Sequence, residues 1–431
     1  MKVLIYIFFL SMTFAQDKEY VVAVGEAELA KDKLHFNDLN YDKTSGIKTD
    51  ELSVGKEFIQ ILKDDFNFYK HKFEVSEKMD DSTYDVDVSL KFSKEIILGV
   101  VLKLKNSTLY QYSEKLYLNN IRTQAHQVAH EMYQKMTGKE SIFNSKIYFL
   151  SDRHAKGSKN VREIYRMDFD GQRPQRITYK DTLIISPSVS PDGSKVLYSV
   201  VEAKWKKGKR GHPVKTQNIN LYLFNLKTKK QKAMSTIAGI NSGAMFSSDG
   251  KDIYLTISHQ KNADIYRMNL QTRAKKRLTK HPLDDVDPHI NEDGSLMAFL
   301  SGRSGRAMIY TLDTTQKNAE PKRISFVGRF NATPRFSPDG KEIVFSSWLD
   351  GKFDLFRVGA DRSNLVRLTK DFGSNEEPWY SPDGEFIVFS SQVVKSRTQA
   401  TQVIWVMNRE GEVVRKLTSE VSKSFTPRWV K

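Results

Sequence analysis

A short turn that occurs five times constrains the fold of this chain more than any other feature. Each copy holds an Asp-Gly pair, at Asp192, Asp249, Asp293, Asp339 and Asp383. Successive pairs lie 57, 44, 46 and 44 residues apart. In residues 336–345 (FSPDGKEIVF), Pro presets φ, the Asp side chain can cap the turn, and Gly can take a positive φ. A repeat of this length is typical of a propeller blade or of a helical array.

The residues between the turns favour the propeller. An alternating apolar strand follows each turn, as in residues 342–346, and a third strand comes later, as in residues 354–358. A fourth short strand then ends in Arg-Leu-Thr or Lys-Leu-Thr, as in residues 366–369. Four antiparallel strands in about 44 residues have the dimensions of a propeller blade. Nothing inside a repeat shows an eleven-residue helical period, which disfavours a helical array.

The two ends of the repeat region set the number of blades. Strands at residues 146–150, 163–167 and 175–178 precede the first Asp-Gly turn, but this unit lacks its first strand. The chain stops at residues 425–430, which look like a first strand without a blade. We therefore expect the C-terminal strand to complete the first blade, so that residues 141–431 form a closed six-bladed β-propeller without exposed sheet edges.

A small α/β domain is expected ahead of the propeller, over residues 16–140. Its predicted elements are a strand at 20–24, a helix at 54–68, strands at 84–92, 95–104 and 108–118, and a helix at 120–136. Gly138 is placed to cap the last helix. The predicted order is β-α-β-β-β-α, and the absence of a Pro/Gly-rich linker favours a fixed arrangement of the two domains.

Composition and the N-terminus indicate an exported protein. Residues 1–15 read as a signal peptide cleaved after Ala15, with an apolar run too short for a mature bilayer span. No later segment reads as a membrane span, and the chain has no Cys, which excludes disulfides and a Cys nucleophile. The net charge of +16 favours acidic partners. Residues 204–212 form a basic hairpin loop with Trp205, either solvated or in contact with an anionic partner.

The domain order, the Ser-Pro-Asp-Gly units and the end at residues 425–429 (FTPRW) resemble the TolB family, the periplasmic component of the Tol-Pal system. Residues 125–138, followed by residues 143–148, look like the family's passage from its last N-terminal helix into the first blade. The resemblance implies a periplasmic, monomeric binding scaffold without catalysis or cofactor. Such a scaffold binds the lipoprotein Pal and the inner-membrane protein TolA, and it supports outer-membrane integrity and invagination during cell division.

The resemblance also implies where the partners bind. The loops leading into the first strand of each blade match the Pal-facing loops of the family. Their candidate residues are Asn241, Asp285, Asp287, Asn331, Thr333, Glu376 and Glu377. TolA would bind the start of the mature chain, at residues 16–28, where a short strand could add to a partner's sheet. Its candidate residues are Tyr20, Val21, Val22 and Val24, although this segment lacks the family's acidic, Ser/Gly-rich pattern. Anionic envelope polymers are a further candidate partner.

Other chemistry finds little support. His126 and His130 are four residues apart, but position 127 is Gln where a zinc peptidase needs Glu. Asp284, Asp285 and Asp287 lack the loop pattern of an EF-hand. No Gly-x-Ser-x-Gly or nucleic-acid motif occurs. The alternative function is a lactonase or esterase with a channel metal, for which Asp287, Asn331 and Glu377 are the candidate ligands.

Overall fold

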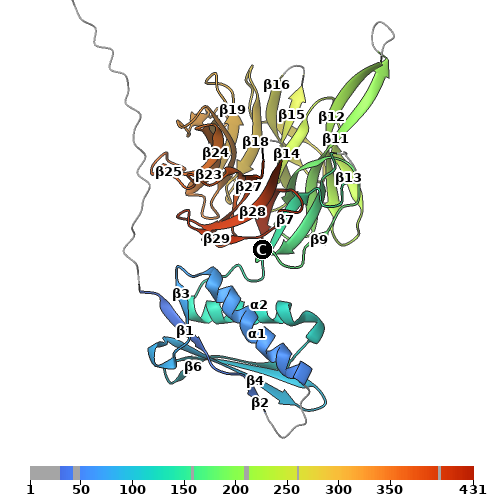
Figure 1. Ribbon diagram of the computed structural model, residues 1–431. Coiled ribbons are helices and arrows are strands. Elements are labelled where there is room, and N and C mark those ends of the chain that lie inside the picture. The colour runs from blue at the N-terminus through green and yellow to red at the C-terminus, as the bar shows by residue number, and fades with distance from the viewer. Residues whose placement is uncertain (1–29, 42–48, 157–159, 208–212, 260–261, 397–398) are drawn as a thin grey trace, which may run out of the picture.

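Six four-stranded antiparallel sheets and one mixed sheet with two helices make up the described part of the chain (Figure 1). This computed structural model describes residues 30–41, 49–156, 160–207, 213–259, 262–396 and 399–431. The expected fold class is confirmed: a small α/β layer precedes a six-bladed β-propeller. The predicted signal peptide and the predicted strand at residues 20–24 lie outside the described residues.

Each blade contains an innermost strand, two middle strands and a short outermost strand. In blade order, the innermost strands are β30 (Ser424–Val430), β10 (Ile184–Val189), β14 (Asn241–Phe246), β18 (Asp285–Ile290), β22 (Phe330–Phe336) and β26 (Ser374–Tyr380). The second strands are β7 (Lys146–Ser151), β11 (Lys195–Lys207), β15 (Asp252–His259), β19 (Leu296–Ser301), β23 (Glu342–Leu349) and β27 (Phe386–Val394). The third strands are β8 (Glu163–Asp168), β12 (Pro213–Asn225), β16 (Asn262–Asn269), β20 (Met308–Asp313), β24 (Lys352–Gly359) and β28 (Ala400–Asn408). The outermost strands are β9 (Gln175–Arg176), β13 (Gln231–Ser235), β17 (Lys275–Arg277), β21 (Lys322–Arg323), β25 (Val366–Arg367) and β29 (Val413–Lys416).

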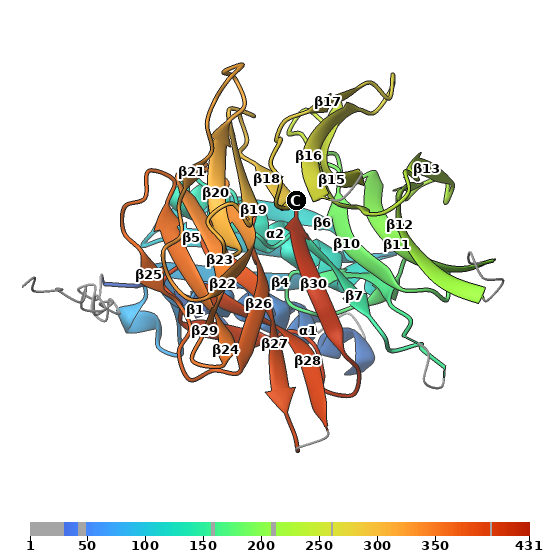
Figure 2. The ribbon, with the colours of Figure 1, turned by 90° about the horizontal axis from the view of Figure 1, so that it is seen from above.

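The C-terminal strand closes the ring, as the sequence predicts. β30 pairs antiparallel with β7, with Phe425 opposite Leu150 and Trp429 opposite Ile147. The innermost strands contact one another in order around the ring, and β30 contacts β10 to complete it. Figure 2, which looks down on the propeller, shows these strands around the centre of the disc. We number the blades from the one that β30 completes.

The Asp-Gly turns have the predicted chemistry. In the turn of blade 5, the Ser337 hydroxyl donates to Asp339 Oδ1 at 2.5 Å, and the Lys341 N–H donates to the same oxygen at 3.1 Å. Gly340 has a φ of 70°, which a residue with a Cβ adopts only with strain. The carboxylate thus satisfies turn donors that would otherwise face only water.

The Arg-Leu-Thr ends of the outermost strands also have a structural role. In blade 5, Arg367 and Thr369 both donate to the fully buried carboxylate of Asp354 on β24, at 2.5 and 3.0 Å. Asp264 in blade 3 and Glu163 in blade 1 bind the corresponding Arg in the same way. These buried charges therefore fasten the outermost strand to its blade.

The α/β layer has more strands than the sequence predicts. Its elements are β1 (Asp32–Phe36), β2 (Asn40–Tyr41), α1 (Thr49–Phe68), β3 (Phe73–Ser76), β4 (Tyr84–Phe92), β5 (Ile96–Leu104), β6 (Ser107–Lys115) and α2 (Ile121–Thr137). The predicted order missed β1, β2 and β3, because these strands are short and their pairs are remote in sequence. β1 lies parallel to both β3 and β4, which places it inside the sheet. Gly138 caps α2 with a φ of 71°, as predicted.

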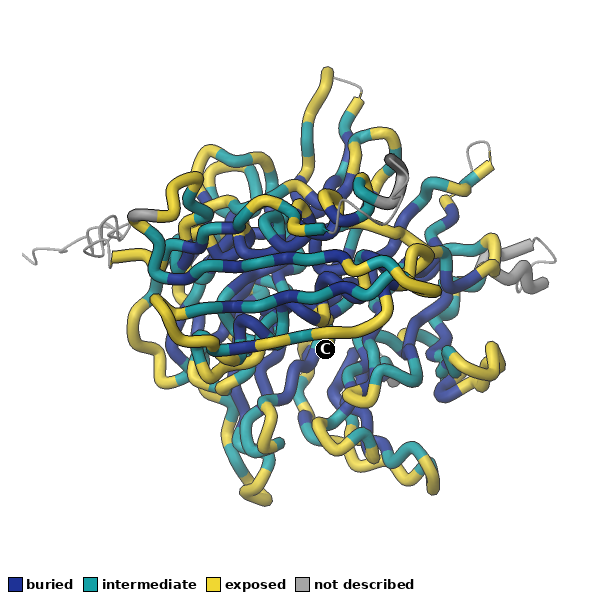
Figure 3. The backbone as a smooth tube through the Cα atoms, turned by 90° about the horizontal axis from the view of Figure 1, so that it is seen from below, coloured by how far each residue is buried: buried dark blue, intermediate teal, exposed yellow. Residues whose placement is uncertain are grey.

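The α/β layer covers one end of the propeller, the end that carries the Asp-Gly turns; we call this the turn end (Figure 1). Phe68 at the end of α1 packs against Phe169 and Phe386, with ring centroids 5.2 and 5.4 Å away. The Tyr69 hydroxyl donates to Asp383 Oδ2 at 2.5 Å. Figure 3, which views the molecule from the side of the α/β layer, shows buried residues in the layer and in the blades behind it. The two parts thus share one continuous hydrophobic core.

Residues 204–207 of the predicted basic hairpin loop belong to a long two-stranded hairpin. β11 and β12 pair over thirteen residues each and project from the end of the propeller opposite the α/β layer (Figure 1). Residues 204–207 therefore belong to a strand, because the ladder continues well beyond the body of the blade. The side chain of Trp205 and residues 208–212 lie outside the described part of the chain.

Candidate partner-binding end of the propeller

A β-bulge interrupts every innermost strand at the same position. Each bulge places one residue at a positive φ, where a Cβ is strained. These residues are Ser186, Gly243, Asp287, Thr333, Glu377 and Thr426, with φ between 50° and 59°. A residue at such a bulge is re-aimed relative to a regular strand. Neighbouring members approach each other: a Cβ added at Gly243 would lie 3.5 Å from Asp287 Cα. We call these six residues the bulge ring.

Hydrogen bonds join the bulge ring from blade to blade. Glu377 accepts from the Thr426 backbone N–H at 2.5 Å and from the Thr426 hydroxyl at 2.8 Å, which ties blade 6 to blade 1. Asp287 pairs with Arg335 of blade 5 at 3.0 Å. The Thr333 hydroxyl lies 3.1 Å from that of Ser346. The two acidic members are thus already engaged with neighbouring blades.

Bulky side chains fill the centre of the propeller next to the bulge ring. The guanidinium groups of Arg335 and Arg428 lie over the Trp379 ring, at 5.5 and 4.7 Å from its centroid. The His289 ring meets the same indole edge-on at 5.2 Å. Only 2% of Arg335 and 4% of Arg428 is exposed, so these side chains are shut off from solvent.

Burial sets the charge state of these central side chains. Burial, together with Arg335 and Arg428, lowers the pKa of His289 well below its usual range, so the imidazole is neutral at pH 7. Burial and Arg335 lower the pKa of Arg428 to about 9, which leaves the guanidinium charged at neutral pH. Asp287 and Glu377 offset the two arginines, as buried charges require. These central side chains have the character of a structural plug.

Glu376 differs from its neighbour Glu377. Burial, with the charge of Glu377 added, raises the pKa of Glu376 to about 7. No hydrogen bond or ion pair of its carboxylate is found among the described residues, whereas Glu377 is bonded to Thr426. Glu376 is thus a partly buried acid without a compensating cation. A basic group of a binding partner can pair with it.

Large apolar side chains gather on the end of the propeller opposite the turn end. We call it the link end, because the chain passes there from the outermost strand of one blade to the innermost strand of the next. Eight exposed large apolar residues lie on its links, strand ends and hairpins: Tyr179, Ile240, Leu283, Phe326, Phe330, Trp348, Val394 and Val421. Among the described propeller residues, Val413 is the one exposed large apolar side chain at the turn end. On the described propeller, the exposed large apolar side chains thus lie mainly at the link end, where a contiguous patch of them would suit a protein partner.

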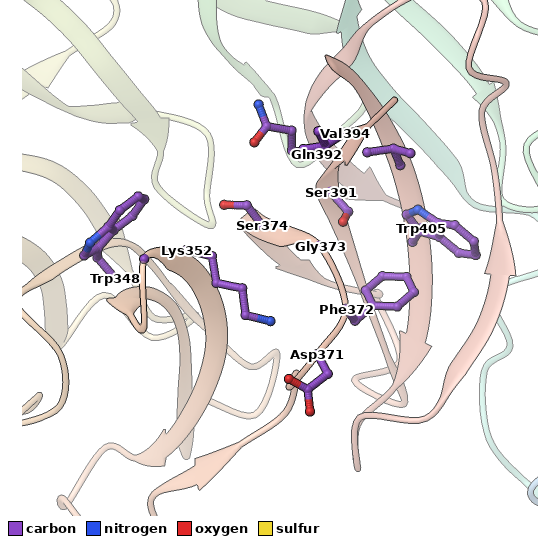
Figure 4. A pocket seen from close by; sticks show the side chains of 12 residues that line it. Trp348, Lys352, Asp371, Phe372, Gly373, Ser374, Ser391, Gln392, Val394 and Trp405 are labelled. Atoms are coloured by element: carbon purple, nitrogen blue, oxygen red, sulfur yellow. The ribbon is translucent and has the colours of Figure 1, made fainter. Parts of the chain in front are cut away.

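A pocket of about 700 Å³ opens between blades 5 and 6 at the link end. Trp348, Phe372 and Trp405 supply aromatic walls, and Lys352 and Asp371 lie on the side between the two blades (Figure 4). The indole N–H of Trp405 is buried and has no hydrogen-bond partner among the described residues. Aromatic walls with an unused donor suit an inserted apolar side chain that carries or adjoins an acceptor.

A family model for the "TolB beta propeller domain" matches residues 133–430, more than half of the chain. The chain belongs to the TolB propeller family. Curated relatives named Tol-Pal system protein TolB, from strains of Francisella tularensis, are 29% identical over 249 residues. This alignment covers 56% of the present chain and 53% of the relative, so the chain spans about half the length of the curated relatives it matches.

Solved structures agree on the fold. TolB from Acinetobacter baumannii superposes with a TM-score of 0.75 at 24% identity, covering 94% of this chain and 97% of the other. A hydrazine synthase from Kuenenia stuttgartiensis shares the propeller with a TM-score of 0.50 at 16% identity, covering 66% of this chain and 46% of the other. Within the described residues of this TolB-family chain, neither helix combines the length and apolar character that a bilayer span requires.

The predicted contact residues lie elsewhere than the sequence suggests. They belong to the innermost strands and not to loops, because those strands begin earlier than predicted. Asn241, Asp285 and Asn331 are fully buried. Asn241 donates to two backbone carbonyls, Asp285 pairs with Arg303 at 2.8 Å, and Asn331 donates to the Val327 carbonyl at 2.9 Å. Asn241 and Asn331 thus stabilise links between blades, and Asp285 holds the hairpin that follows β19. Asp287, Thr333 and Glu377 belong to the bulge ring, and Glu376 lies beside it.

Sequence reasoning missed the apolar residues of the link end. A usable signal was present, because most of the links after an Arg-Leu-Thr or similar strand carry one large apolar side chain. The predicted TolA-contact residues Tyr20, Val21, Val22 and Val24 lie outside the described part of the chain.

The arrangement of the acidic groups favours structural ion pairs over a metal centre. His126, Asp168 and Asp170 come together in the described chain, with ligand atoms within 4.8 Å of one another. However, Lys146 and Arg173 pair with Asp168, Arg122 pairs with Asp170, and His126 Nδ1 binds Asp65 at 2.8 Å. These cations already neutralise the carboxylates that a divalent ion would need.

Proposed function

We propose that this protein is a periplasmic scaffold of the Tol-Pal system that binds Pal through the link end of its propeller. In this proposal it connects Pal, at the outer membrane and peptidoglycan, with the inner-membrane Tol proteins, and so supports outer-membrane integrity and invagination during division. The signal peptide would direct export and be cleaved after Ala15. The family assignment supports a role in the Tol-Pal system. The exposed apolar residues of the link end support the proposed position of the docking surface.

The apolar side chains carry this proposal. A contiguous exposed apolar patch marks a protein contact, and we propose that these side chains together form such a patch. The residues are spread over links of several blades, so the surface suits a broad protein contact more than a small ligand. Among the described aromatic residues, Tyr179 and Phe326 have the largest exposure, at 70% and 60%. Aromatic residues of this kind dominate the binding energy of many interfaces.

Glu376 and the pocket between blades 5 and 6 add polarity to this surface. A basic side chain of the partner near Glu376 would pair with a carboxylate that has no cation of its own. An apolar side chain in the pocket would cover Trp348 and Trp405. The scaffold proposal involves no catalysis: the plug of Arg335, Trp379 and Arg428 occupies the centre, and the acidic members of the bulge ring are engaged in bonds between blades.

The proposal is tested by calorimetric titration with the periplasmic domain of Pal from the same organism. We expect saturable one-to-one binding that the Tyr179→Ala and Phe326→Ala double variant weakens by at least about tenfold, the effect of losing interface hot spots. Val413→Ala at the turn end is the matched control and should leave the affinity unchanged. Absence of binding at tens of micromolar, or equal weakening by the control, would contradict the proposal.

A second contact, with TolA, is proposed for residues 16–28. The support is weaker, because the segment departs from the family pattern and lies outside the described residues. A short extended segment can add a strand to a partner's sheet edge. The shared core of the α/β layer and blades 1 and 6 offers a physical connection from this segment towards the propeller. We therefore propose that the occupancy of one site alters the affinity of the other.

A further inference from the structure

The positive charge of this protein is concentrated in two adjacent blades. Residues 184–283, which form blades 2 and 3, contain 19 Lys and Arg against 5 Asp and Glu, a net charge of +14. The whole chain has a net charge of +16, so all other residues together contribute +2. A charge distributed by composition alone would spread over the six blades. Six of the 19 basic residues belong to residues 204–215, in the sequence of the long hairpin; without them, residues 184–283 still carry 13 Lys and Arg against 5 Asp and Glu, a net charge of +8.

Lys195 and Lys251 of these blades pair with Asp192 and Asp249, but a further group of lysines is exposed and has no such partner. Seven of them lie on or next to the outermost strands β13 and β17: Lys227, Lys229, Lys230, Lys232, Lys275, Lys276 and Lys280. None forms an ion pair among the described residues. The few carboxylates nearby are engaged elsewhere, Asp252 with Arg267 and Asp264 with Arg277.

A side-chain contact joins the two blades into one surface. Arg273, in the turn before β17, donates to the backbone carbonyls of Met234 and Ala233 on β13, at 3.1 and 3.2 Å. Lys232 of blade 2 therefore lies close to Lys275 and Lys276 of blade 3. Figure 2 shows the two blades side by side on one flank of the ring. We call this surface, made of the seven lysines, the lysine flank.

We propose that the lysine flank binds a linear polyanion, a polymer with repeated phosphate or other anionic groups. Lysine ammonium groups are hydrated point charges that suit an extended series of anions without demanding a fixed geometry. A strip of them focuses positive potential along the rim of the disc. A membrane surface is less suited, since Leu283 is the one exposed large apolar side chain among the described residues within three positions of these lysines, which is little apolar surface to enter a bilayer.

Edge protection explains only part of this charge. Lysines on edge strands discourage pairing with other chains, and every outermost strand is an edge. However, Lys227, Lys229 and Lys230 precede β13, and the outermost strands β9, β21 and β25 each contain one or two basic residues without a comparable cluster beside them. The excess on blades 2 and 3 therefore requires a further reason, and a polyanionic ligand supplies one.

The test is a titration of the full chain with inorganic polyphosphate of defined length, at low and at physiological salt. Lys229→Glu, Lys230→Glu and Lys232→Glu are combined in one variant. We expect its affinity to fall by at least about tenfold, as the reversal of several surface charges predicts. Binding should also weaken as salt screens the charges.

The control variant combines Lys317→Glu, Lys322→Glu and Lys370→Glu, three exposed lysines of blades 4 and 5. It changes the net charge equally and should leave the affinity within about twofold, because these lysines lie away from the flank. Equal weakening by both variants would overturn the proposal, since only net charge would matter. Preferential binding of phosphatidylglycerol vesicles, or no binding of polyphosphate at low salt, would also overturn it. Melting temperatures of both variants establish that they fold.

Discussion

Two adjacent glutamates show how a single residue's environment decides its role. Glu377 occupies the bulge ring and accepts two hydrogen bonds from Thr426, so it joins blade 6 to blade 1. The Glu376 carboxylate has no hydrogen bond or ion pair among the described residues, and burial raises its pKa to about 7. The same side chain therefore stabilises the ring at one position and costs stability at the next, because the bulge supplies donors to only one of them.

Replacing Glu376 should stabilise the protein, and more so at high pH. Because its pKa in the folded state is raised, folding favours the protonated form, and stability is lost as the pH rises from about 4.5 towards 7 and beyond. Glu376→Gln should remove that loss and add on the order of 1 kcal/mol at pH 8, with little gain at pH 4. Urea unfolding at the two pH values measures this.

Glu377→Ala is the matched comparison for that prediction. It deletes the acceptor of the Thr426 N–H and hydroxyl, and it should lower the free energy of unfolding by about 1–3 kcal/mol at pH 8. Destabilisation by both variants would show that Glu376 has a bonding partner in solution.

At the scale of the element, β30 differs from the other innermost strands. Its blade combines strands from the first and the last parts of the propeller sequence. Trp429 on β30 is 2% exposed and donates its indole N–H to Ser145 at 2.8 Å. Its backbone carbonyl accepts from the Trp379 indole of blade 6 at 3.0 Å. This strand therefore fastens the first blade, the last blade and the segment that leads from the α/β layer.

Trp429→Ala should destabilise the whole propeller. The loss of a buried aromatic side chain and its hydrogen bond is expected to lower the free energy of unfolding by about 3–5 kcal/mol. Val421→Ala, in the same C-terminal segment but 95% exposed, should change it by less than about 0.5 kcal/mol. Denaturant unfolding followed by tryptophan fluorescence and by circular dichroism compares the two. A Trp429 variant as stable as the parent would show that ring closure does not depend on this side chain.

At the scale of the molecule, the α/β layer and the propeller form one packed unit. Phe68 inserts between Phe169 and Phe386, and Lys72 pairs with Glu385 at 2.7 Å. Burial raises the pKa of Glu385, but the bonds from His71 and Lys72 outweigh burial and bring it to about 2. An acid with a depressed pKa stabilises the fold at neutral pH, and this contribution is lost as the pH falls from about 4.5 towards 2.

The proposed coupling between the two partner sites depends on that interface. Removal of residues 16–28 should change the affinity for Pal by at least about fivefold, the lower range of coupling between distant sites. Phe68→Ala, which loosens the contact between layer and propeller, should reduce this difference. Calorimetric titration with the Pal domain measures all four combinations. Equal affinities with and without residues 16–28 would exclude the coupling while leaving Pal binding intact.

The sequence by itself determined the architecture of the propeller. The spacing of the Asp-Gly turns, the alternating strands and the orphan strand at residues 425–430 predicted six blades closed by the C-terminus. These signals are local and repeated: Asp339 caps its own turn, and Gly340 takes its positive φ, within a few residues of chain. Repetition then lets one well-defined unit explain the others.

Only the tertiary structure decided which polar residues are buried and which apolar residues are exposed to the proposed partner. Asn241, Asp285 and Asn331 resemble loop residues in sequence, but neighbouring strands bury them and supply their hydrogen bonds. The short strand β1 became part of a sheet through pairing with β3 and β4, which come much later in the chain. The gathering of Tyr179, Phe326 and the other apolar residues at one end likewise depends on the closure of the ring. Contacts between residues remote in sequence set burial, and local pattern carries little information about them.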